Sequence, residues 1–257
     1  MFPKISIITP TLNQARFIEE TIKSVLSQNY SDLEYIVIDG GSTDGTQDIL
    51  EKYNGLLSWV SEHDNGQVDA INKGLRMATG DVVAYLNSDD IYTPNTLLTI
   101  GTFFQTRPEA QILTGKCINV DFNGNETRSV ITKYKNFWLR VGNDNILKIM
   151  NYVSQPATFW RRSLLDSIGL FDPEYRFAMD YDYWLHIAQF HKIHFLDRYL
   201  AKFRIYPTSI TSSDSKKQFE EEYKIAAKYS NSYYKALHMI HAKLSYFVYA
   251  NIINKKS

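Results

Sequence analysis

Apolar and polar residues follow one another along the first hundred positions in a pattern that predicts alternating strands and helices. Short, mostly apolar runs typical of buried strands occupy residues 5–8, 35–38 and 82–86. Helices are expected between and after them, through Ile18, Ile22, Val25 and Leu26, over 46–53, through Val68, Ile71, Leu75 and Ala78, and from Pro94 onward with Thr93 as N-cap. This alternation favours an α/β fold with a mainly parallel sheet covered by helices on both faces.

The second half of the chain has a different pattern. Asn123-Gly124 lies between the apolar segments 116–120 and 128–131, which predicts a β-hairpin. Residues 133–150 are expected to be irregular and partly helical. Further strands are expected at 157–160, 193–196 and 201–205, a helix at 181–190, and one or two helices from Asp214. We therefore expect one domain over 1–213, with a parallel half of nucleotide-binding type of fold (about 1–115) and a mixed, substrate-side half (about 116–213), followed by a helical extension, 214–257.

Composition narrows the class of protein. A chain of 257 residues with 44% hydrophobic residues is long and apolar enough to bury a core. Lys+Arg 28 and Asp+Glu 28 cancel to a net charge of +0, so total charge gives no reason to expect a nucleic-acid partner. The single cysteine, Cys117, excludes an internal disulfide and fits a reducing compartment. No run approaches the ~20 apolar residues of a membrane span, and the start lacks a signal-peptide pattern. We expect a cytoplasmic protein.

Polar clusters follow three of the expected strands. They are Thr9–Asn13, Asp39–Gly45 and Asn87–Asp90, written here by their first and last residues. Each cluster alone is explained by turn formation. Because the carboxyl ends of parallel strands share one sheet edge, the three together predict a ligand site there.

The glycine-rich cluster does not match the common phosphate-binding motifs. A dinucleotide fingerprint would need a glycine where Ser42 stands, and a P-loop would need Lys after Gly45, where Thr46 stands. Asp39, at a strand end and followed by the small Gly40, is instead suited to accept hydrogen bonds from a ribose or base with its carboxylate.

The carboxylates of the third cluster predict a metal site. Adjacent Asp89 and Asp90 repel each other unless a cation or helix end neutralises them. Mg²⁺ in proteins typically takes one or two carboxylates together with substrate phosphates. A metal role is favoured for Asp89, with Asn87 two residues earlier. For Asp90, capping or charging the helix that begins near Pro94 is the favoured interpretation.

Six stretches, in order across about residues 4–205, carry a family resemblance. They are Ile7-Ile8-Thr9-Pro10-Thr11-Leu12-Asn13, Val37-Ile38-Asp39-Gly40-Gly41-Ser42-Thr43-Asp44-Gly45-Thr46, Asp69-Ala70-Ile71-Asn72-Lys73-Gly74, Ala78-Thr79-Gly80-Asp81, Leu86-Asn87-Ser88-Asp89-Asp90 and Asp180-Tyr181-Asp182-Tyr183-Trp184-Leu185. The chain resembles the family-2 inverting glycosyltransferases, which have the GT-A fold, a Rossmann-like α/β fold.

The resemblance implies a set of site residues. The expected nucleotide-binding residues are Thr9, Pro10, Thr11, Asn13, Asp39, Gly41, Asp64, Asn72, Lys73, Asn87 and Ser88. Asp89 would hold a divalent metal, Mn²⁺ or Mg²⁺, and Asp180 would be the catalytic base. For Lys73, a phosphate contact and a solvated helix position are equally open. For Asp180, capping of the helix 181–190 is the alternative role, and both roles are compatible.

Two departures from the family pattern affect these expectations. Asn87 stands where the family usually has the first Asp of D-x-D, so an amide replaces a charge. Met179 stands where a carboxylate is expected beside Asp180. Asp182 is a nearby rival for the role of base.

The implied activity is metal-dependent transfer of a sugar, of hexosyltransferase type and with inversion, from a UDP- or dTDP-sugar. The acceptor would be a hydroxyl on a glycan or lipid-linked molecule, in surface polysaccharide or lipid-linked glycan biosynthesis. Two alternatives remain open. One is a non-catalytic nucleotide-sugar-binding protein, which the changes at Asn87 and Met179 keep open, and the other is a nucleotidyltransferase.

The segment 231–257 predicts a basic amphipathic helix. It holds Lys235, Lys243, Lys255 and Lys256 and no acidic residue, and its apolar face comprises Leu237, Ile240, Leu244, Phe247 and Val248. Such a helix either lies in a membrane interface, here the inner face of the membrane, or packs on the catalytic domain or a second subunit. Packing or dimerisation is the favoured interpretation.

Overall fold

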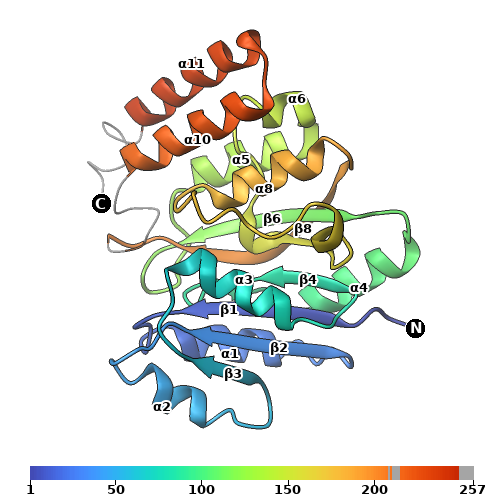
Figure 1. Ribbon diagram of the computed structural model, residues 1–257, viewed down its shortest axis with the longest axis vertical. Helices are drawn as coiled ribbons and strands as arrows, with labels where there is room; N and C mark the ends of the chain where they lie inside the picture. Colours follow the sequence, from blue (N-terminus) through green and yellow to red (C-terminus); the bar gives the residue numbers. More distant parts are fainter. Residues whose placement is uncertain (208, 210–214, 249–257) are drawn as a thin grey trace. The chain divides into compact units, whose positions relative to one another are not determined.

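A computed structural model describes residues 1–207, 209 and 215–248 (Figure 1). The chain forms two compact units, each assembled from three segments. The first unit comprises 1–117, 154–171 and 194–203, and the second comprises 118–153, 172–193 and the described residues beyond 203.

A mixed β-sheet lies mainly in the first unit. Among the described residues its eight strands are β1 (Ile5–Thr11), β2 (Leu33–Asp39), β3 (Ser58–Ser61), β4 (Val82–Tyr85), β5 (Ile91–Tyr92), β6 (Ile112–Val120), β7 (Thr158–Arg161) and β8 (Ile193–Arg204). They run in the order β3-β2-β1-β4-β7-β6-β8-β5. Pairing is parallel from β3 to β4 and antiparallel between β4 and β7, β7 and β6, and β8 and β5. The α/β class predicted from the sequence is confirmed.

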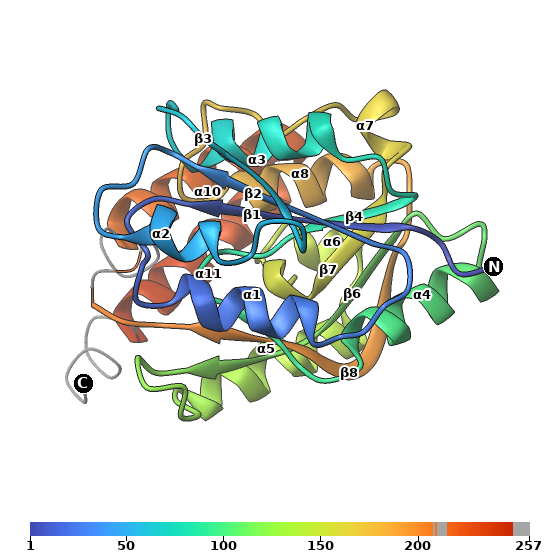
Figure 2. The ribbon, with the colours of Figure 1, turned by 90° about the horizontal axis from the view of Figure 1, so that it is seen from below.

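Helices cover both faces of this sheet. The helices of the first unit are α1 (Ile18–Leu26), α2 (Thr46–Glu51), α3 (Gln67–Met77), α4 (Thr96–Thr106) and α7 (Leu164–Ser167). Figure 2 shows α3 on one face and α1 and α4 on the other. A Cβ at Gly74 would overlap the side chain of Ile8 and lie 3.3 Å from Ile38 Cγ1. Glycine at this position therefore lets α3 lie directly on β1 and β2.

Pro10 lies at a position of β1 where its missing backbone N–H removes no hydrogen bond between paired strands. β1 pairs with β4 only as far as Ile8, which pairs with Tyr85. The carbonyls of Ile8 and Thr11 point to opposite neighbours, accepting from Leu86 and Gly40 respectively. The nitrogen of Pro10 therefore points to the β4 side, beyond the last ladder bond, so its missing N–H leaves no strand unpaired.

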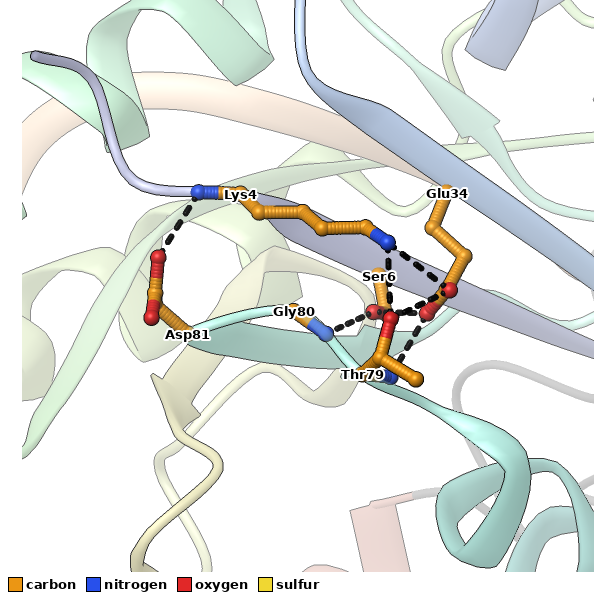
Figure 3. Close-up of polar contacts among 6 residues, drawn as sticks. All are labelled: Lys4, Ser6, Glu34, Thr79, Gly80 and Asp81. Carbon is orange, nitrogen blue, oxygen red and sulfur yellow. Dashed lines mark hydrogen bonds and ion pairs between the residues drawn. The ribbon is translucent and has the colours of Figure 1, made fainter.

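A polar cluster ties the amino ends of β1, β2 and β4 together (Figure 3). Glu34 accepts from the Ser6 hydroxyl at 2.5 Å, from the Thr79 hydroxyl at 2.6 Å and from Lys4 Nζ at 3.1 Å. Burial alone would raise the pKa of Glu34, but these donors and the Thr79 N–H lower it to about 2. Gly80 is required here, because a Cβ would lie 2.6 Å from Ser6 Oγ. This part of the family-like stretch 78–81 is thus structural.

The second unit is mostly helical. Its helices are α5 (Ser129–Val141), α6 (Asp144–Leu147), α8 (Met179–Ala188), α10 (Ser215–Tyr229) and α11 (Ser232–Val248). Figure 1 shows α10 and α11 as an antiparallel pair. Glu221 on α10 accepts from the backbone N–H groups of Arg176, Phe177 and Ala178 at 3.2, 2.7 and 3.0 Å. These donors precede α8, so α10 supplies the acidic cap for that helix.

The predicted strand at 128–131 is wrong. The turn forms as expected, with the Asp121 N–H donating to the Asn125 carbonyl at 2.8 Å, but the chain then enters α5. Val130, Tyr134, Phe137 and Val141 recur at i, i+4, i+7 and i+11, and this helical period outweighs the local hairpin signal. The stretch 133–150, expected to be irregular and partly helical, is mostly helical: it holds most of α5 and all of α6.

Other boundaries also differ from the sequence prediction. The two strands expected at 193–196 and 201–205 form one strand, β8. Helix α4 begins at Thr96 after Asn95 (φ 64°), so Thr93 is not its cap. The Thr93 hydroxyl donates instead to the Tyr199 carbonyl at 2.7 Å. Asp214, where the terminal helices were expected to begin, lies outside the described residues.

Candidate active site

The loops after β1 and β2 are held together by short polar contacts. The Asn13 N–H donates to Ser42 Oγ at 2.7 Å, and Asn13 Oδ1 accepts from the Thr43 N–H at 2.9 Å. The Gln14 N–H donates to Thr46 Oγ1 at 3.0 Å. The two loops that the sequence assigned to nucleotide binding therefore form one surface at the carboxyl end of the parallel strands.

The buried side chain of Asp39 links the segments that form this surface. It is fully buried at the end of β2. Its carboxylate accepts from the Ser42 N–H at 3.0 Å, from Ser42 Oγ at 2.5 Å and from Ser61 Oγ at 2.6 Å. Asp39 thus fixes the glycine-rich loop and the end of β3 relative to each other, a role that its position in the sequence did not reveal.

Asp64 lies directly against the backbone of Gly40. A Cβ built on Gly40 would be 2.6 Å from Asp64 Oδ2, while Asp64 Oδ1 accepts from the Gly66 N–H at 2.8 Å. The adjacent Gly41 has φ +86°, a conformation that side chains rarely adopt. Gly40 thus makes room for the Asp64 carboxylate at the site, while Gly41 provides the backbone conformation of the turn.

Two threonines of β1 differ in their surroundings. Thr9 Oγ1 is 3.1 Å from the hydroxyl of Tyr35, which satisfies both buried groups. The Thr11 hydroxyl is also buried, but it has no hydrogen-bond partner among the described residues. An unpaired buried hydroxyl is costly unless a ligand or water pairs with it. This supports a ligand contact for Thr11 and a packing role for Thr9.

The loop after β4 is held by hydrogen bonds within the loop and from side chains of α1 and α3. Asn87 Oδ1 accepts from Gln67 Nε2 at 2.7 Å, and Asn87 Nδ2 lies 3.4 Å from Asp90 Oδ2. The carbonyls of Ser88 and Asp90 both accept from the Thr21 hydroxyl, at 2.9 and 2.8 Å. Asp90 is buried at this turn, and the N-cap of α4 is Asn95, so the expected capping role for Asp90 is wrong.

The 87–90 loop is the position where the sequence placed a divalent metal. Within the described parts of the chain, no group of three or more His, Cys, Asp or Glu side chains is arranged to hold a metal ion. The loop offers oxygen donors alone, and Asp89 is its partly exposed carboxylate. This donor set fits a hard divalent cation that completes its coordination with substrate oxygens.

Asn72 and Lys73, both expected at the nucleotide, are engaged within the chain. Asn72 Nδ2 donates to the Phe171 carbonyl at 2.8 Å, and the Phe171 N–H donates to Asn72 Oδ1 at 3.0 Å. Lys73 forms an ion pair with Glu62. These contacts favour a structural role for the Asn72 amide.

The two candidate bases in the second unit have different partners. Asp182 is buried and accepts from Lys228 Nζ at 3.1 Å and from the Tyr229 hydroxyl at 3.0 Å. Asp180 lies in the first turn of α8 and accepts from the Tyr181 N–H at 2.8 Å. The helix starts at Met179 and Glu221 caps it, so Asp180 is not its N-cap.

A second carboxyl lies near Asp180. Burial raises the pKa of Asp180, against the opposing effects of Lys135 and a hydrogen bond from Asn151. Burial also raises the pKa of Glu222 on α10 to about 7, and the charge of Asp180 contributes to that rise. Gln218 Nε2 donates to Glu222 Oε1 at 3.0 Å. Glu222 was not predicted from the sequence, because no local motif links α10 to residue 180.

Comparison with known sequences identifies the family. The profile of "Glycosyl transferase family 2" matches residues 6–169. A "PGL/p-HBAD biosynthesis glycosyltransferase" of Mycobacterium bovis (strain BCG / Pasteur 1173P2) is 30% identical over 187 residues, 70% of this chain and 68% of that protein. The chain therefore belongs to glycosyl transferase family 2, and it is a glycosyltransferase, as the resemblance implied.

Comparison with solved structures identifies the fold. Residues 1–349 of TarS from S. aureus, in complex with UDP-GlcNAc, align with a TM-score of 0.71 and 20% identity, over 97% of this chain and 76% of that one. A mannosyltransferase from Pyrobaculum calidifontis, in complex with GDP-Man and Mn²⁺, aligns with a TM-score of 0.71 and 20% identity, over 95% and 69%. The expected GT-A fold is confirmed. In the part of the chain that the structure describes, no helix is long and apolar enough to cross a membrane.

Proposed function

We propose that the protein transfers a hexose from a UDP- or dTDP-sugar to a hydroxyl of a glycan or lipid-linked acceptor, with inversion at the sugar carbon. The family supports transfer of a sugar from a nucleotide sugar, and the mycobacterial relative is named for PGL/p-HBAD biosynthesis. The proposed setting is surface polysaccharide or lipid-linked glycan biosynthesis on the cytoplasmic side of the membrane.

The donor site is proposed at the joined loops of the first unit. Thr11, with its unpaired buried hydroxyl, and Asp64, beside Gly40, are the proposed direct contacts. Asn13 and Asp39 position these loops through Ser42. Pro10, Gly41, Lys73, Asn87 and Ser88 complete the proposed nucleotide-binding set, whereas Thr9 and Asn72, which the sequence also placed there, are proposed to support it through their contacts with Tyr35 and Phe171.

Asp89 is the residue proposed to hold Mn²⁺ or Mg²⁺, with oxygens of the 87–90 loop nearby. The cation would offset negative charge on the departing nucleoside diphosphate. Asn87 contributes an amide in place of a carboxylate, so the loop carries less charge than a D-x-D sequence would. Its bonds to Gln67 and Asp90 fix the loop that presents Asp89.

Asp180 is proposed as the general base. The acceptor oxygen attacks the anomeric carbon as the bond from that carbon to the diphosphate oxygen breaks, and Asp180 takes the proton of the acceptor hydroxyl. The observation that carries this assignment is the contrast between the two aspartates. Asp182 is engaged by Lys228 and Tyr229, whereas burial raises the pKa of Asp180 and so makes it a stronger base.

Paired substitutions test this proposal. Asp180→Asn should lower transfer by about 10²–10⁴-fold, the usual contribution of a general base, while the affinity for nucleoside diphosphate is retained. Asp182→Asn should lower the melting temperature, because it weakens the contact with Lys228, and should leave most of the transfer activity. If Asp182→Asn abolishes transfer in folded protein while Asp180→Asn does not, the assignment is reversed. Donor binding without transfer or donor hydrolysis in the wild type would favour a non-catalytic binding protein instead.

A further inference from the structure

The apolar face of α11 is exposed to solvent. Ile240, Leu244 and Phe247 are 54%, 61% and 61% exposed. The helix is held through its other side, where His238 is buried and stacks on Tyr181 with ring centroids 6.1 Å apart. Packing on the catalytic domain, one of the two arrangements that the sequence favoured together with a second subunit, therefore does not cover these three side chains.

Helix α5 carries a second exposed apolar face. Val130, Tyr134, Phe137 and Val141 are 78%, 44%, 56% and 49% exposed. Their spacing places all four on one side of the helix. Single exposed apolar residues are common on protein surfaces, whereas a continuous exposed apolar stripe often marks a site of interaction with another molecule or a membrane.

The two exposed faces belong to neighbouring helices of the second unit. The Tyr134 hydroxyl lies 3.2 Å from His241 Nε2, and the two rings are stacked with an angle of 7° between them. Lys148, at the end of α6, lies 5.4 Å from the ring of Tyr234. Tyr134 belongs to the α5 stripe and contacts α11 through His241, so we group the exposed apolar residues of these two helices as one candidate surface. We call it the α5–α11 surface: Val130, Tyr134, Phe137, Val141, Ile240, Leu244 and Phe247.

The charges on these helices all have one sign. Neither α5 nor α11 contains an Asp or a Glu. Their basic residues are Lys133, Lys135 and Arg140 on α5 and Lys235 and Lys243 on α11. Lys133 and Lys243 are exposed beside the apolar stripes. Since the whole chain has a net charge of +0, this concentration of positive charge is local.

We propose that the α5–α11 surface docks on an anionic lipid membrane, with the apolar and aromatic side chains in the interface and the lysines at the headgroups. Amphipathic helices with Lys or Arg beside Phe, Leu and Tyr bind anionic bilayers in this way. A second copy of the chain fits less well, because a symmetric contact would bring the same cationic faces together. Docking goes beyond sugar transfer and is measured without donor or acceptor, so its failure is distinct from failure of the proposed function.

Vesicle sedimentation tests this surface with the full-length chain. The protein should pellet with vesicles of phosphatidylcholine and phosphatidylglycerol, pellet poorly with phosphatidylcholine alone, and be released by high salt. Lys133→Gln with Lys243→Gln should weaken binding roughly 30-fold, at about 1 kcal/mol for each basic residue near the surface. The matched control, Lys52→Gln with Lys192→Gln, removes the same charge from exposed positions outside both helices and should bind as the wild type.

The apolar part of the surface has its own variants. Phe137→Gln with Leu244→Gln should abolish sedimentation, whereas Leu56→Gln, at a residue 64% exposed in the first unit, should not. Circular dichroism and melting curves establish that each variant is folded. Two results would overturn membrane docking: wild-type protein that stays in the supernatant with anionic vesicles at low salt, or a lipid-independent dimer that dissociates on Leu244→Gln.

Discussion

The backbone of Gly40 and the carboxylate of Asp64 are in direct contact, so that a single added carbon at residue 40 would lie 2.6 Å from Asp64 Oδ2. Gly40 follows β2 and Asp64 follows β3, so this contact joins the ends of two adjacent strands. Glycine at residue 40 therefore accommodates a side chain 24 positions further along the chain, in addition to forming part of a local turn.

Gly40→Ala should displace the Asp64 carboxylate and weaken binding of nucleoside diphosphate by roughly tenfold or more, the effect of losing one hydrogen bond to a charged group. Stability should change little, because the conflict is with the end of one side chain. Calorimetric titration together with thermal melting measures both. Asp64→Ala is the matched variant, and the double variant should bind no more weakly than Asp64→Ala alone. Additive losses would show that the two residues act separately.

Asp39→Ala should lower both folding stability and nucleotide affinity. Three donors, the Ser42 N–H and the hydroxyls of Ser42 and Ser61, would lose a buried charged acceptor. Because Asp39 is fully buried, its removal acts on folding as well as on the nucleotide site. Ser61→Ala, which removes a single one of these bonds, should have a smaller effect on the melting temperature. A melting temperature for Asp39→Ala equal to that of the wild type would contradict the organising role of Asp39.

The parts of the molecule that local patterns describe well were predictable. The strand ending at Asp39 and the helix carrying Gly74 follow from short-range periodicity, since buried strands and amphipathic helices have distinct apolar spacing. The contacts of Asp39 with Ser61 and of Glu222 with the neighbourhood of Asp180 join distant segments, which single-sequence periodicity does not reveal. The hairpin prediction failed for a different reason. A two-residue turn signal was given more weight than the helical period that begins at Val130.

Glu34 should make stability depend on acid pH. Its pKa is lowered from 4.5 to about 2 in the folded protein, so its ionised form is favoured by folding. The resulting stabilisation is present above about pH 4.5 and is lost as the pH falls toward 2; by linkage it amounts to at most about 3 kcal/mol. Urea unfolding of Glu34→Gln should show lower stability at pH 7 and a flatter acid limb. Glu51→Gln, at an exposed residue, is the control and should follow the wild type.

Glu222 should produce the opposite dependence, near neutral pH. Its pKa is raised from 4.5 to about 7, so the folded protein favours the protonated form. This stabilisation is present below about pH 4.5 and is lost as the pH rises through 7. Wild-type melting temperature should therefore fall between pH 5 and 8 by more than that of Glu222→Gln. Glu220→Gln, on the same helix at an exposed position, should behave as the wild type.

The same ionisation should alter the proposed base. As Glu222 loses its proton near pH 7, its negative charge further disfavours ionisation of Asp180, which raises the pKa of Asp180 and strengthens it as a base. The pH profile of transfer should then contain a step near pH 7 that Glu222→Gln removes, while the affinity for nucleoside diphosphate stays constant. A step that persists in Glu222→Gln would assign it to another group. A change in donor affinity without any change in the profile would show that Glu222 acts on binding and not on proton transfer.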